Sequence, residues 1–360
     1  MKYLHALNKI EGVGTQRLKL LLAEFGTAQN AWQASLSDLQ KALGGDILPE
    51  RIFFEKQRID PDAEWEQVEK SNIQVIDFLS PSYPKLLKEI HSPPYLIYTR
   101  GNLVFDSTPA IAIVGSRKFS NYGEQLASTF ARDLAKAGFV IVSGLALGID
   151  AISHRSTLEA RGKTIAVLGG GIDNETIYPR ANYNLAQEII SSGGIVMSDY
   201  LPGTPATAAT FPARNRIIAG LALGTLVVEA GEKSGTLITA KMALESNREV
   251  FSIPGSIFSP TSIGTNNLIK SGAKMVTCVQ DILEEFDLSQ SLTETKQATL
   301  KLPENKEEEI LLTILSDVPL HIDNIAKQSK LSVSAISATL MMMEIKGWVK
   351  NLGGQNYILL

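Results

Sequence analysis

Hydrophobic and polar positions follow different patterns in successive parts of the chain. Residues 1–72 carry apolar residues at helical spacing, and residues 73–286 alternate short apolar runs with amphipathic segments. Residues 287–303 are polar, with a composition typical of a linker. Residues 304–360 return to helical spacing and end in two short apolar runs. The pattern therefore predicts three domains, with a linker before the last one.

The first predicted domain, residues 1–72, contains a glycine turn. Apolar residues recur at helical spacing over residues 3–25, on both sides of Gly12-Val13-Gly14. A glycine turn that opens a helix is similar to a helix-hairpin-helix, whose free N–H groups can hold a DNA phosphate. Small helical domains also contain such turns without any role in DNA binding. We expect a helix-hairpin-helix or SAM-like domain and leave its role open.

The second predicted domain, residues 73–286, has an α/β pattern. Two short strands, 73–79 and 95–99, are predicted before the main part. Strands that alternate with helices indicate a parallel, doubly wound, Rossmann-like sheet, and ligands of such sheets bind beyond the carboxyl ends of the strands. The predicted main strands are 110–114, 139–142, 164–168, 195–198, 225–229, 250–253 and 274–276.

The last predicted domain, residues 304–360, has the pattern of a winged helix. A helix-turn-helix pattern over 322–328 and 333–346 is followed by a hairpin. The second of these helices has Lys346 as its only basic residue and contains three consecutive methionines. Helices that recognise duplex DNA need basic side chains on the phosphates and polar ends on the base edges. We therefore expect a structural or protein-contacting role here, in place of a transcription regulator's.

Composition and charge narrow the possible partners. Cys278 is the only cysteine, which excludes an intrachain disulfide and a cysteine-rich metal site. No apolar run is long enough for a membrane span, and no signal peptide is expected, so we expect a cytoplasmic protein. The formal net charge is −4, but residues 109–278 carry 15 basic and 12 acidic side chains. A phosphate-backbone ligand would be drawn to this net-positive segment.

Small residues and cations gather at the predicted strand ends. Glycine lets a ligand approach the backbone, and free N–H groups at helix N-termini attract anions. Arginine offers a fork of donors that matches a phosphate, and a base could stack on Phe211, although core packing is the alternative for that ring. We predict one anion-binding crevice that also receives Gly169-Gly170-Gly171 and Arg216. The predicted DNA or phosphate ligands are Gly115, Ser116, Arg117, Ser143, Gly144, Arg180, Phe211, Arg214, Asn215, Lys233, Ser234 and Gly235.

Several enzyme signatures are missing. The chain has no phosphate-binding loop of nucleotide triphosphatases and no dinucleotide fingerprint after the first strand. His154 has no partner spaced for a metal, so we expect neither a metal nor a cofactor. Glu229 and Asp150 could act in catalysis, but we interpret Glu229 as a strand end and Asp150 as a local cap or partner. We therefore expect a binding protein and no catalytic residues.

The motifs of the middle domain resemble those of one family. They are Val114-Gly115-Ser116-Arg117, Ser143-Gly144-Leu145-Ala146-Leu147-Gly148-Ile149-Asp150, Tyr178-Pro179, Phe211-Pro212-Ala213-Arg214-Asn215-Arg216-Ile217-Ile218-Ala219-Gly220-Leu221, Ser234-Gly235-Thr236-Leu237-Ile238-Thr239 and Pro254-Gly255-Ser256. In this order they are similar to those of the DprA/Smf family of bacterial DNA-processing proteins. The resemblance covers residues 80–278 closely and the outer domains more weakly.

The resemblance implies a recombination mediator of natural transformation. Such a protein binds and protects incoming single-stranded DNA, loads the RecA recombinase on it, and forms a dimer through its Rossmann-like domain. The family's DNA pocket carries over onto Ser116, Arg117, Ser143, Gly144, Arg180, Phe211, Arg214 and Asn215. Three departures are Arg180, at a position often filled by lysine, Leu147, where a lysine can occur, and Ile152-Ser153-His154, where Ala-Ala-His is commoner.

An alternative resemblance would make the protein an enzyme. The lysine-decarboxylase-like phosphoribohydrolases, which cleave nucleoside monophosphates, carry a Pro-Gly-Gly-x-Gly-Thr-x-x-Glu loop at the corresponding strand end. In this sequence the proline is missing, and Thr239 stands where the glutamate would be. A threonine with apolar neighbours is a poor general base. The sequence therefore favours DNA binding over hydrolysis.

Overall fold

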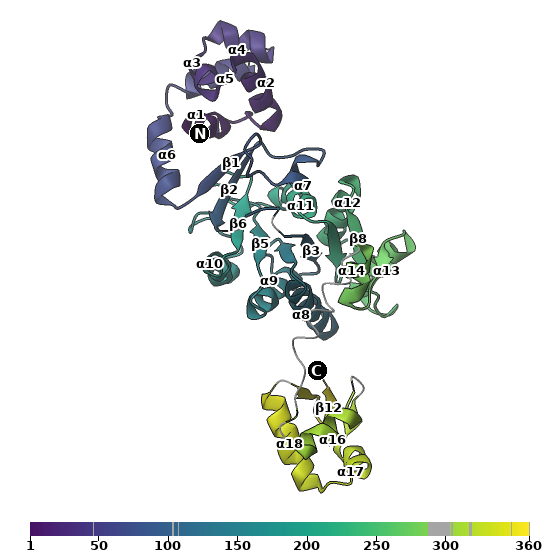
Figure 1. Ribbon diagram of the computed structural model, residues 1–360. Coiled ribbons are helices and arrows are strands. Elements are labelled where there is room, and N and C mark those ends of the chain that lie inside the picture. Colours follow the sequence, from purple (N-terminus) through teal and green to yellow (C-terminus); the bar gives the residue numbers. More distant parts are fainter. Residues whose placement is uncertain are drawn as a thin grey trace. The chain divides into compact units, whose positions relative to one another are not determined.

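The protein folds as two compact units, Met1–Ser291 and Leu292–Leu360 (Figure 1). The computed structural model describes residues 1–45, 47–102, 104–106, 108–286, 303, 305–316, 319–346 and 348–359. The predicted linker 287–303 lies outside the described residues except for Pro303. The predicted domain boundaries at residues 72 and 286 stay predictions, because the first unit contains both the N-terminal helices and the sheet.

The first unit begins with a bundle of short helices around the predicted glycine turn. The helices are α1 (Lys2–Lys9), α2 (Thr15–Phe25), α3 (Ala28–Gln33), α4 (Leu36–Leu43), α5 (Ile47–Glu55) and α6 (Pro61–Lys70). Gly12 has a φ of +91°, and a β-carbon there would lie 3.1 Å from Leu48 Cδ1. The turn therefore packs against α5, and glycine is required by both its backbone conformation and its close neighbour.

A sheet of nine strands among the described residues forms the rest of the first unit. Its spatial order is β1-β2-β6-β5-β4-β3-β7-β8-β9. The strands are β1 (Gln74–Asp77), β2 (Leu96–Gly101), β3 (Ala110–Val114), β4 (Val140–Ser143), β5 (Thr164–Val167), β6 (Ile195–Ser198), β7 (Gly224–Val227), β8 (Glu249–Ser252) and β9 (Lys274–Met275). The strands from β6 to β9 in this order are parallel, which confirms the α/β Rossmann-like prediction.

The two early strands differ from the prediction. β2 pairs antiparallel with β6, and β1 pairs antiparallel with β2, so both extend the main sheet where we expected them to precede it. Antiparallel neighbours need no crossover helix, and only the four-residue helix α7 (Lys85–Lys88) lies between β1 and β2. The prediction rested on the alternation of strands and helices. This alternation does not indicate an antiparallel edge strand that is added without a crossover helix.

Helices cover both faces of the sheet (Figure 1). On one face, α8 (Asn121–Lys136) packs against α9 (Ile149–Glu159), and α10 (Tyr183–Ser191) lies beside α9. On the other face, α11 (Thr210–Gly220) packs against α12 (Gly235–Glu245) and α7. The chain adds β4 on one side of β3 and β7 on the other. Crevices at such a switch point are where open α/β sheets bind ligands.

Buried polar contacts join the N-terminal helices to the sheet. His5 Nδ1 lies 3.0 Å from the Tyr98 hydroxyl of β2, and Thr15 Oγ1 accepts a hydrogen bond from the Tyr95 amide at 3.1 Å. Leu7 and Leu18 share one hydrophobic cluster with Tyr98. The helices therefore pack on the antiparallel edge of the sheet through apolar contacts and a few paired polar groups.

His5 predicts a pH dependence of stability. Burial lowers the pKa of its imidazole to about 4, so between about pH 6.5 and about pH 4 the unfolded chain binds a proton that the folded chain does not. Stability should therefore fall as the pH drops through this window, by about 2 kcal/mol between about pH 7 and about pH 5. Urea unfolding of the wild type and His5→Gln measures the difference. Exposed His91 offers the control His91→Gln, and an equal pH dependence in wild type and His5→Gln would contradict the prediction.

The second unit is a winged helix, as predicted. Its elements are α16 (Lys306–Ile314), β10 (Leu320–His321), α17 (Ile322–Ser329), α18 (Val333–Ile345), β11 (Val349–Asn351) and β12 (Asn356–Leu359). The three strands pair in the order β10-β12-β11 around a small core that includes Leu311, Ile325, Ile336 and Leu340. Within the described residues of both units, no helix has the length and apolar character needed to cross a membrane.

Candidate nucleic-acid interface

A pocket of about 770 Å³ opens at the carboxyl ends of β3 and β7, at the switch point of the sheet. Many of the predicted ligands meet there although they come from three separate segments of the chain. The predicted residues that line the pocket are Gly115, Ser116, Arg117, Phe211, Arg214, Asn215, Ser234 and Gly235. The other lining residues are Val114, Lys118, Ala146, Asp150, Tyr178, Ala206, Thr207, Ala208, Pro212, Ile218, Thr236, Ile238 and Thr239.

Arg117 and two aromatic rings form the exposed wall of this pocket. The Arg117 guanidinium carbon lies 5.3 Å from the centroid of the Phe211 ring, and the centroids of Phe211 and Tyr178 are 5.8 Å apart. Tyr178 is 52% exposed, whereas Phe211 is half-buried and packs one edge against Gly169. The ring therefore has one packed side and one side in the pocket, and base stacking on it stays a prediction. A cation beside aromatic faces suits a ligand with phosphates and flat bases.

The loop that carries Arg117 is held by the backbone around it. The Ser116 amide donates to the Glu229 carbonyl at 2.9 Å, and the Ser116 hydroxyl donates to the Lys118 carbonyl at 2.6 Å. A β-carbon on Gly148, whose φ is +84°, would lie 2.5 Å from the Ser116 carbonyl oxygen. The glycine after β4 is therefore required so that the loops after β3 and β4 can touch. This packing fixes the position of the backbone from which the Arg117 side chain extends into the pocket.

Arg214 and Asp150 form the floor of the pocket and are almost completely buried. Asp150 Oδ2 accepts hydrogen bonds from the amides of Gly144, at 3.1 Å, and Ala146, at 3.4 Å. Arg214 donates to the carbonyls of Gly144, at 2.7 Å, and Val167. Burial raises the pKa of Asp150, and the positive charge of Arg214 opposes that rise. Burial lowers the pKa of Arg214 to about 10, and the guanidinium therefore stays charged at neutral pH.

These contacts change the role expected for Arg214. Its guanidinium is 4% exposed and bonded to main-chain oxygens, so it ties α11 to the loop after β4 and to the end of β5. A phosphate contact by Arg214 stays a prediction. The structure itself shows an arginine that organises the loops of the pocket.

Other predicted ligands lie outside the pocket lining. Ser143 is fully buried and donates to the Ile113 carbonyl at 2.7 Å, and Gly144 lies beneath the floor between Asp150 and Arg214. Arg180 is exposed and donates to the Asn174 carbonyl at 2.5 Å, and Lys233 is exposed next to Ser234. The structure therefore does not bring these side chains into the pocket. For Arg180 and Lys233, which solvent reaches, DNA contact stays a prediction.

The glycine triplet after β5 does not line the pocket either. A β-carbon on Gly169 would lie 3.0 Å from Phe211 Cδ1, and one on Gly170 would lie 2.9 Å from the Ala206 amide nitrogen. The segment before α11 therefore covers these glycines. Glycine is needed at these positions because the segment before α11 packs directly on their backbone. The position of a residue after a strand does not reveal such packing.

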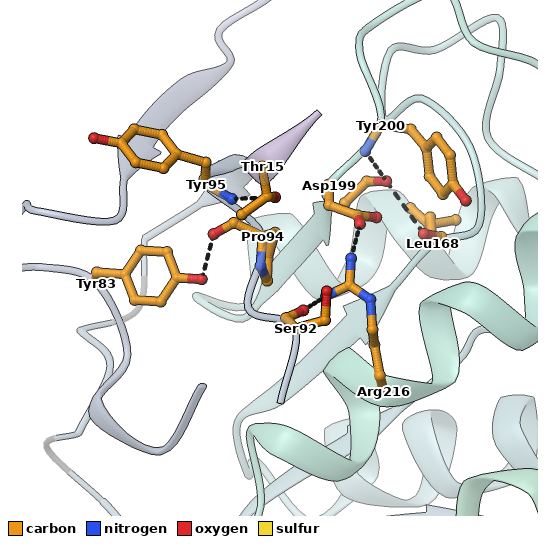
Figure 2. A network of polar contacts seen from close by, with 10 residues as sticks. Thr15, Tyr83, Ser92, Pro94, Tyr95, Leu168, Asp199, Tyr200 and Arg216 are labelled. Atoms are coloured by element: carbon orange, nitrogen blue, oxygen red, sulfur yellow. Dashed lines mark hydrogen bonds and ion pairs between the residues drawn. The ribbon is translucent and has the colours of Figure 1, made fainter. Parts of the chain in front are cut away.

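Arg216 was expected in the crevice and points elsewhere. Figure 2 shows its guanidinium between Asp199 and the Ser92 carbonyl. It donates to the Ser92 carbonyl at 2.7 Å and pairs with Asp199. Burial raises the pKa of the Asp199 carboxyl, and the positive charge of Arg216 opposes that rise. Arg216 thus fastens α11 to the connector that precedes β2. Two arginines two residues apart on a helix point to different sides, which explains the error.

Two pocket residues that bear on binding, Tyr178 and Lys118, were not among the predicted ligands. Tyr178 was noticed only as part of a motif, and Lys118 was not singled out although it follows Arg117. Lys118 could have been predicted, because it is a second cation directly beside the predicted ligand Arg117. No signal marked Tyr178 as the partner of Phe211, because the two rings are far apart in the sequence.

Glu229 and His154 have structural partners. Glu229 is 2% exposed and accepts hydrogen bonds from the Ser120 amide and hydroxyl and from the Thr261 hydroxyl. His154 is fully buried, with Nδ1 2.7 Å from Thr164 Oγ1. Among the residues that the structure describes, no group of three or more histidine, cysteine, aspartate or glutamate side chains could hold a metal. Glu229 thus joins elements of the fold through both carboxylate oxygens, and His154 does so through Nδ1, whereas its buried Nε2 has no hydrogen-bond partner in the described part of the chain.

The second unit presents an apolar face on the helix that a DNA-reading winged helix would use. Met341 is 66% exposed and Met342 is 52% exposed. Lys346, the only basic residue of this helix region, lies 2.6 Å from Glu308 and covers the Trp348 ring. The geometry therefore agrees with the expectation that this helix is poorly suited to phosphates.

Comparisons with known proteins agree on one family. The sequence profile of DNA recombination-mediator protein A matches residues 74–287, and that of the DprA winged helix domain matches residues 295–355. Protein Smf of Synechocystis sp. is 35% identical, with 99% of this chain and 98% of that protein aligned. DNA processing protein DprA of Streptococcus pneumoniae is 40% identical, with 79% of this chain and 97% of that protein aligned.

Solved structures point to the same family. The X-ray structure of DNA processing protein A from Streptococcus pneumoniae matches with a TM-score of 0.68 and 39% identity, covering 79% of this chain and 98% of that one. DNA processing protein A from Helicobacter pylori, whose structure was described for its single-stranded DNA binding mode, matches with a TM-score of 0.54 and 30% identity, covering 62% of this chain and 96% of that one. The chain belongs to the DprA/Smf family of DNA recombination mediators.

Proposed function

We propose that the pocket at the switch point binds single-stranded DNA. The observation that carries this proposal is the Arg117 guanidinium beside the Phe211 and Tyr178 rings, at the mouth of a pocket that also contains Lys118. Cations neutralise the phosphates, and aromatic faces stack on bases without regard to sequence. The positively polarised N-terminus of α12, at Ser234 and Gly235, also borders the pocket and favours an anion there.

An unpaired strand fits this arrangement better than a duplex does. Phe211 and Tyr178 can stack only on bases whose faces are free, and bases inside a duplex are stacked on one another. The pocket is recessed and has its aromatic rings along its wall, whereas proteins that read duplex DNA insert a helix or strands into a groove. The second unit, with its apolar α18, offers no such basic helix.

We propose that the pocket binds its ligand without catalysis. Of the acidic residues at the strand ends, Asp150 holds two backbone amides and Glu229 accepts three hydrogen bonds. Thr239, which stands where the related hydrolases carry glutamate, is 2% exposed at the pocket wall. A general base has to reach the substrate, and Asp150 and Glu229 are 7% and 2% exposed and hold amides or hydroxyls of the fold.

The biological role that we propose follows from family membership. In it the protein acts in the cytoplasm, protects incoming single-stranded DNA during natural transformation and loads RecA on it. It works as a homodimer that forms through the Rossmann-like domain. Similarity to the DprA/Smf proteins is what supports RecA loading and dimer formation. Binding of single-stranded DNA is supported by this similarity and also by the chemistry of the pocket.

A titration against three ligands tests the proposal. An oligothymidylate should bind at least about tenfold more tightly than a duplex of the same length, since each stacked base contributes about 1–3 kcal/mol. AMP should release no base in the presence of the protein. Fluorescence anisotropy measures the two affinities, and chromatography of the AMP reaction measures base release. Equal affinity for single strand and duplex, or turnover of AMP that Arg117→Ala abolishes, would reject it.

A further inference from the structure

An exposed apolar loop follows β8 at the same edge of the sheet as the pocket. We call residues 253–262, between β8 and α13 (Ile263–Lys270), the β8 loop. At its tip Phe258 is 90% exposed and Ile257 is 80% exposed, and these are the largest exposed fractions among the large hydrophobic residues of the described chain. Because two neighbouring large apolar side chains are exposed together, the tip is an apolar patch of the kind that marks a binding surface.

The β8 loop is bonded to the segment that carries Arg117. That segment leaves β3, contributes Arg117 and Lys118 to the pocket, and continues to Tyr122 at the start of α8. The Tyr122 hydroxyl donates to the Pro254 carbonyl at 2.9 Å. Buried Glu229 accepts hydrogen bonds from both Ser120 and Thr261, one from each segment. The exposed tip is therefore attached to the pocket wall through fixed contacts.

Two further aromatic residues are exposed on this connecting segment. Phe119 is 40% exposed and Tyr122 is 47% exposed. Phe119 directly follows the pocket residue Lys118. Aromatic side chains are thus exposed on both segments, beginning one residue beyond the pocket and ending at the tip of the β8 loop.

Carboxylates are distributed unevenly between the two directions in which a strand could leave the pocket. Toward β5 and the N-terminal helices, a second pocket of about 740 Å³ contains the carboxylates Glu64, Asp173 and Glu175 beside the cations Lys9, Lys70 and Arg100. Toward β8, the sequence has no acidic residue from 250 to 280, and none from 107 to 123. Glu229 in between is buried, which leaves Glu232 as the exposed carboxylate of the loop after β7. A polyanion therefore meets fewer carboxylates on the β8 side.

We propose that the β8 loop, together with Phe119 and Tyr122, is a second stacking platform for the single strand as it leaves the pocket. This inference rests on the proposed function, because it takes the same strand as its ligand. Sites for single strands combine cations on the backbone with successive aromatic faces. Here Arg117 lies over the Phe211 ring of the pocket, and Lys118 directly precedes Phe119 of the platform. The platform adds length to the binding site without adding base specificity.

The test measures how affinity rises with the length of the strand. Oligothymidylates of about 4 to about 16 nucleotides span the usual site sizes of single-strand-binding folds. For the wild type, affinity should rise further once the oligonucleotide is longer than the pocket can accommodate. For Phe258→Ala in the full chain, that rise should be at least about fivefold smaller, which corresponds to one lost stacking contact. Phe258→Tyr, which keeps an aromatic face, should restore the rise, and Phe258→Leu should not.

The matched control is Leu244→Ala, which removes another exposed apolar side chain, 61% exposed, at the far end of α12. It should leave the length dependence as in the wild type. An unchanged length dependence in Phe258→Ala, or full restoration by Phe258→Leu, overturns the platform. So does a change in oligomeric state with unchanged DNA binding, which would assign the tip to a second copy of the chain. The proposed function fails separately, if even the shortest bound strands are insensitive to Arg117→Ala.

Discussion

Replacing Arg117 and Phe211 together by alanine should weaken oligothymidylate binding by about a hundredfold at low salt. The stacked base accounts for about 1–3 kcal/mol and a charge-assisted phosphate contact for about 1.5–3 kcal/mol. Because Arg117 lies over the Phe211 ring, the two single substitutions should not add, and the double-mutant cycle should show a coupling of about 0.5 kcal/mol or more. Anisotropy titrations of the wild type and the three variants measure all of these values.

Salt dependence separates the two side chains. Loss of one phosphate contact should flatten the slope of log affinity against log salt by about 0.7 for a single strand, so Arg117→Ala should show this change and Phe211→Ala should not. Arg155→Ala is the matched control because Arg155, in α9, is also exposed but lies outside the pocket lining and is no predicted ligand, and it should leave the slope as in the wild type. A double variant that binds as tightly as the wild type at low salt would remove the pocket from DNA binding.

Replacing Arg214 by alanine should destabilise the protein by about 3–5 kcal/mol, the usual cost of leaving a buried charge without its partner. Asp150 would keep its two amide contacts but lose the positive charge that opposes the effect of burial on its pKa. Because a protonated carboxyl is less costly to bury, the destabilisation should be smaller at about pH 5 than at about pH 8. Urea unfolding at both pH values measures it.

The control for Arg214→Ala is a double variant that removes the charges of both Arg214 and Asp150 and is expected to keep the fold. Asp150→Asn leaves an oxygen for the amides of Gly144 and Ala146, so the pair Asp150→Asn with Arg214→Met should cost less than the sum of its single changes. A destabilisation by Arg214→Ala that is the same at both pH values would show that Asp150 does not respond to Arg214. An additive double variant would lead to the same conclusion.

Much of the fold could be predicted because the alternation of apolar runs and amphipathic segments reports each parallel strand and its helix. All the predicted strands of the main sheet are present, with ends shifted by one or two residues. The antiparallel edge of β1 and β2 was not predicted as part of the sheet, since a strand's own pattern does not tell which strand it pairs with. The same limit applies to the packing of α1 on β2 through His5.

The candidate site could be predicted in part for a related reason. Position after a strand identified Gly115, Arg117 and Ser234, because the carboxyl ends of parallel strands meet at one edge. It did not separate them from Ser143, which follows the same rule but turns its hydroxyl into the sheet. Side-chain direction depends on the packing of neighbours, and the neighbours come from distant segments.

The sequence by itself determined the family motifs, the order of elements and the strand ends at which the pocket lies, because these depend on local residue order. Only the tertiary structure decided which side chains face the pocket. It placed Arg117 over Phe211, buried Arg214 beside Asp150, covered Gly169 with the segment before α11 and turned Arg216 toward Asp199. The physical reason is that an arginine or a glycine satisfies several environments equally well, and long-range packing selects among them.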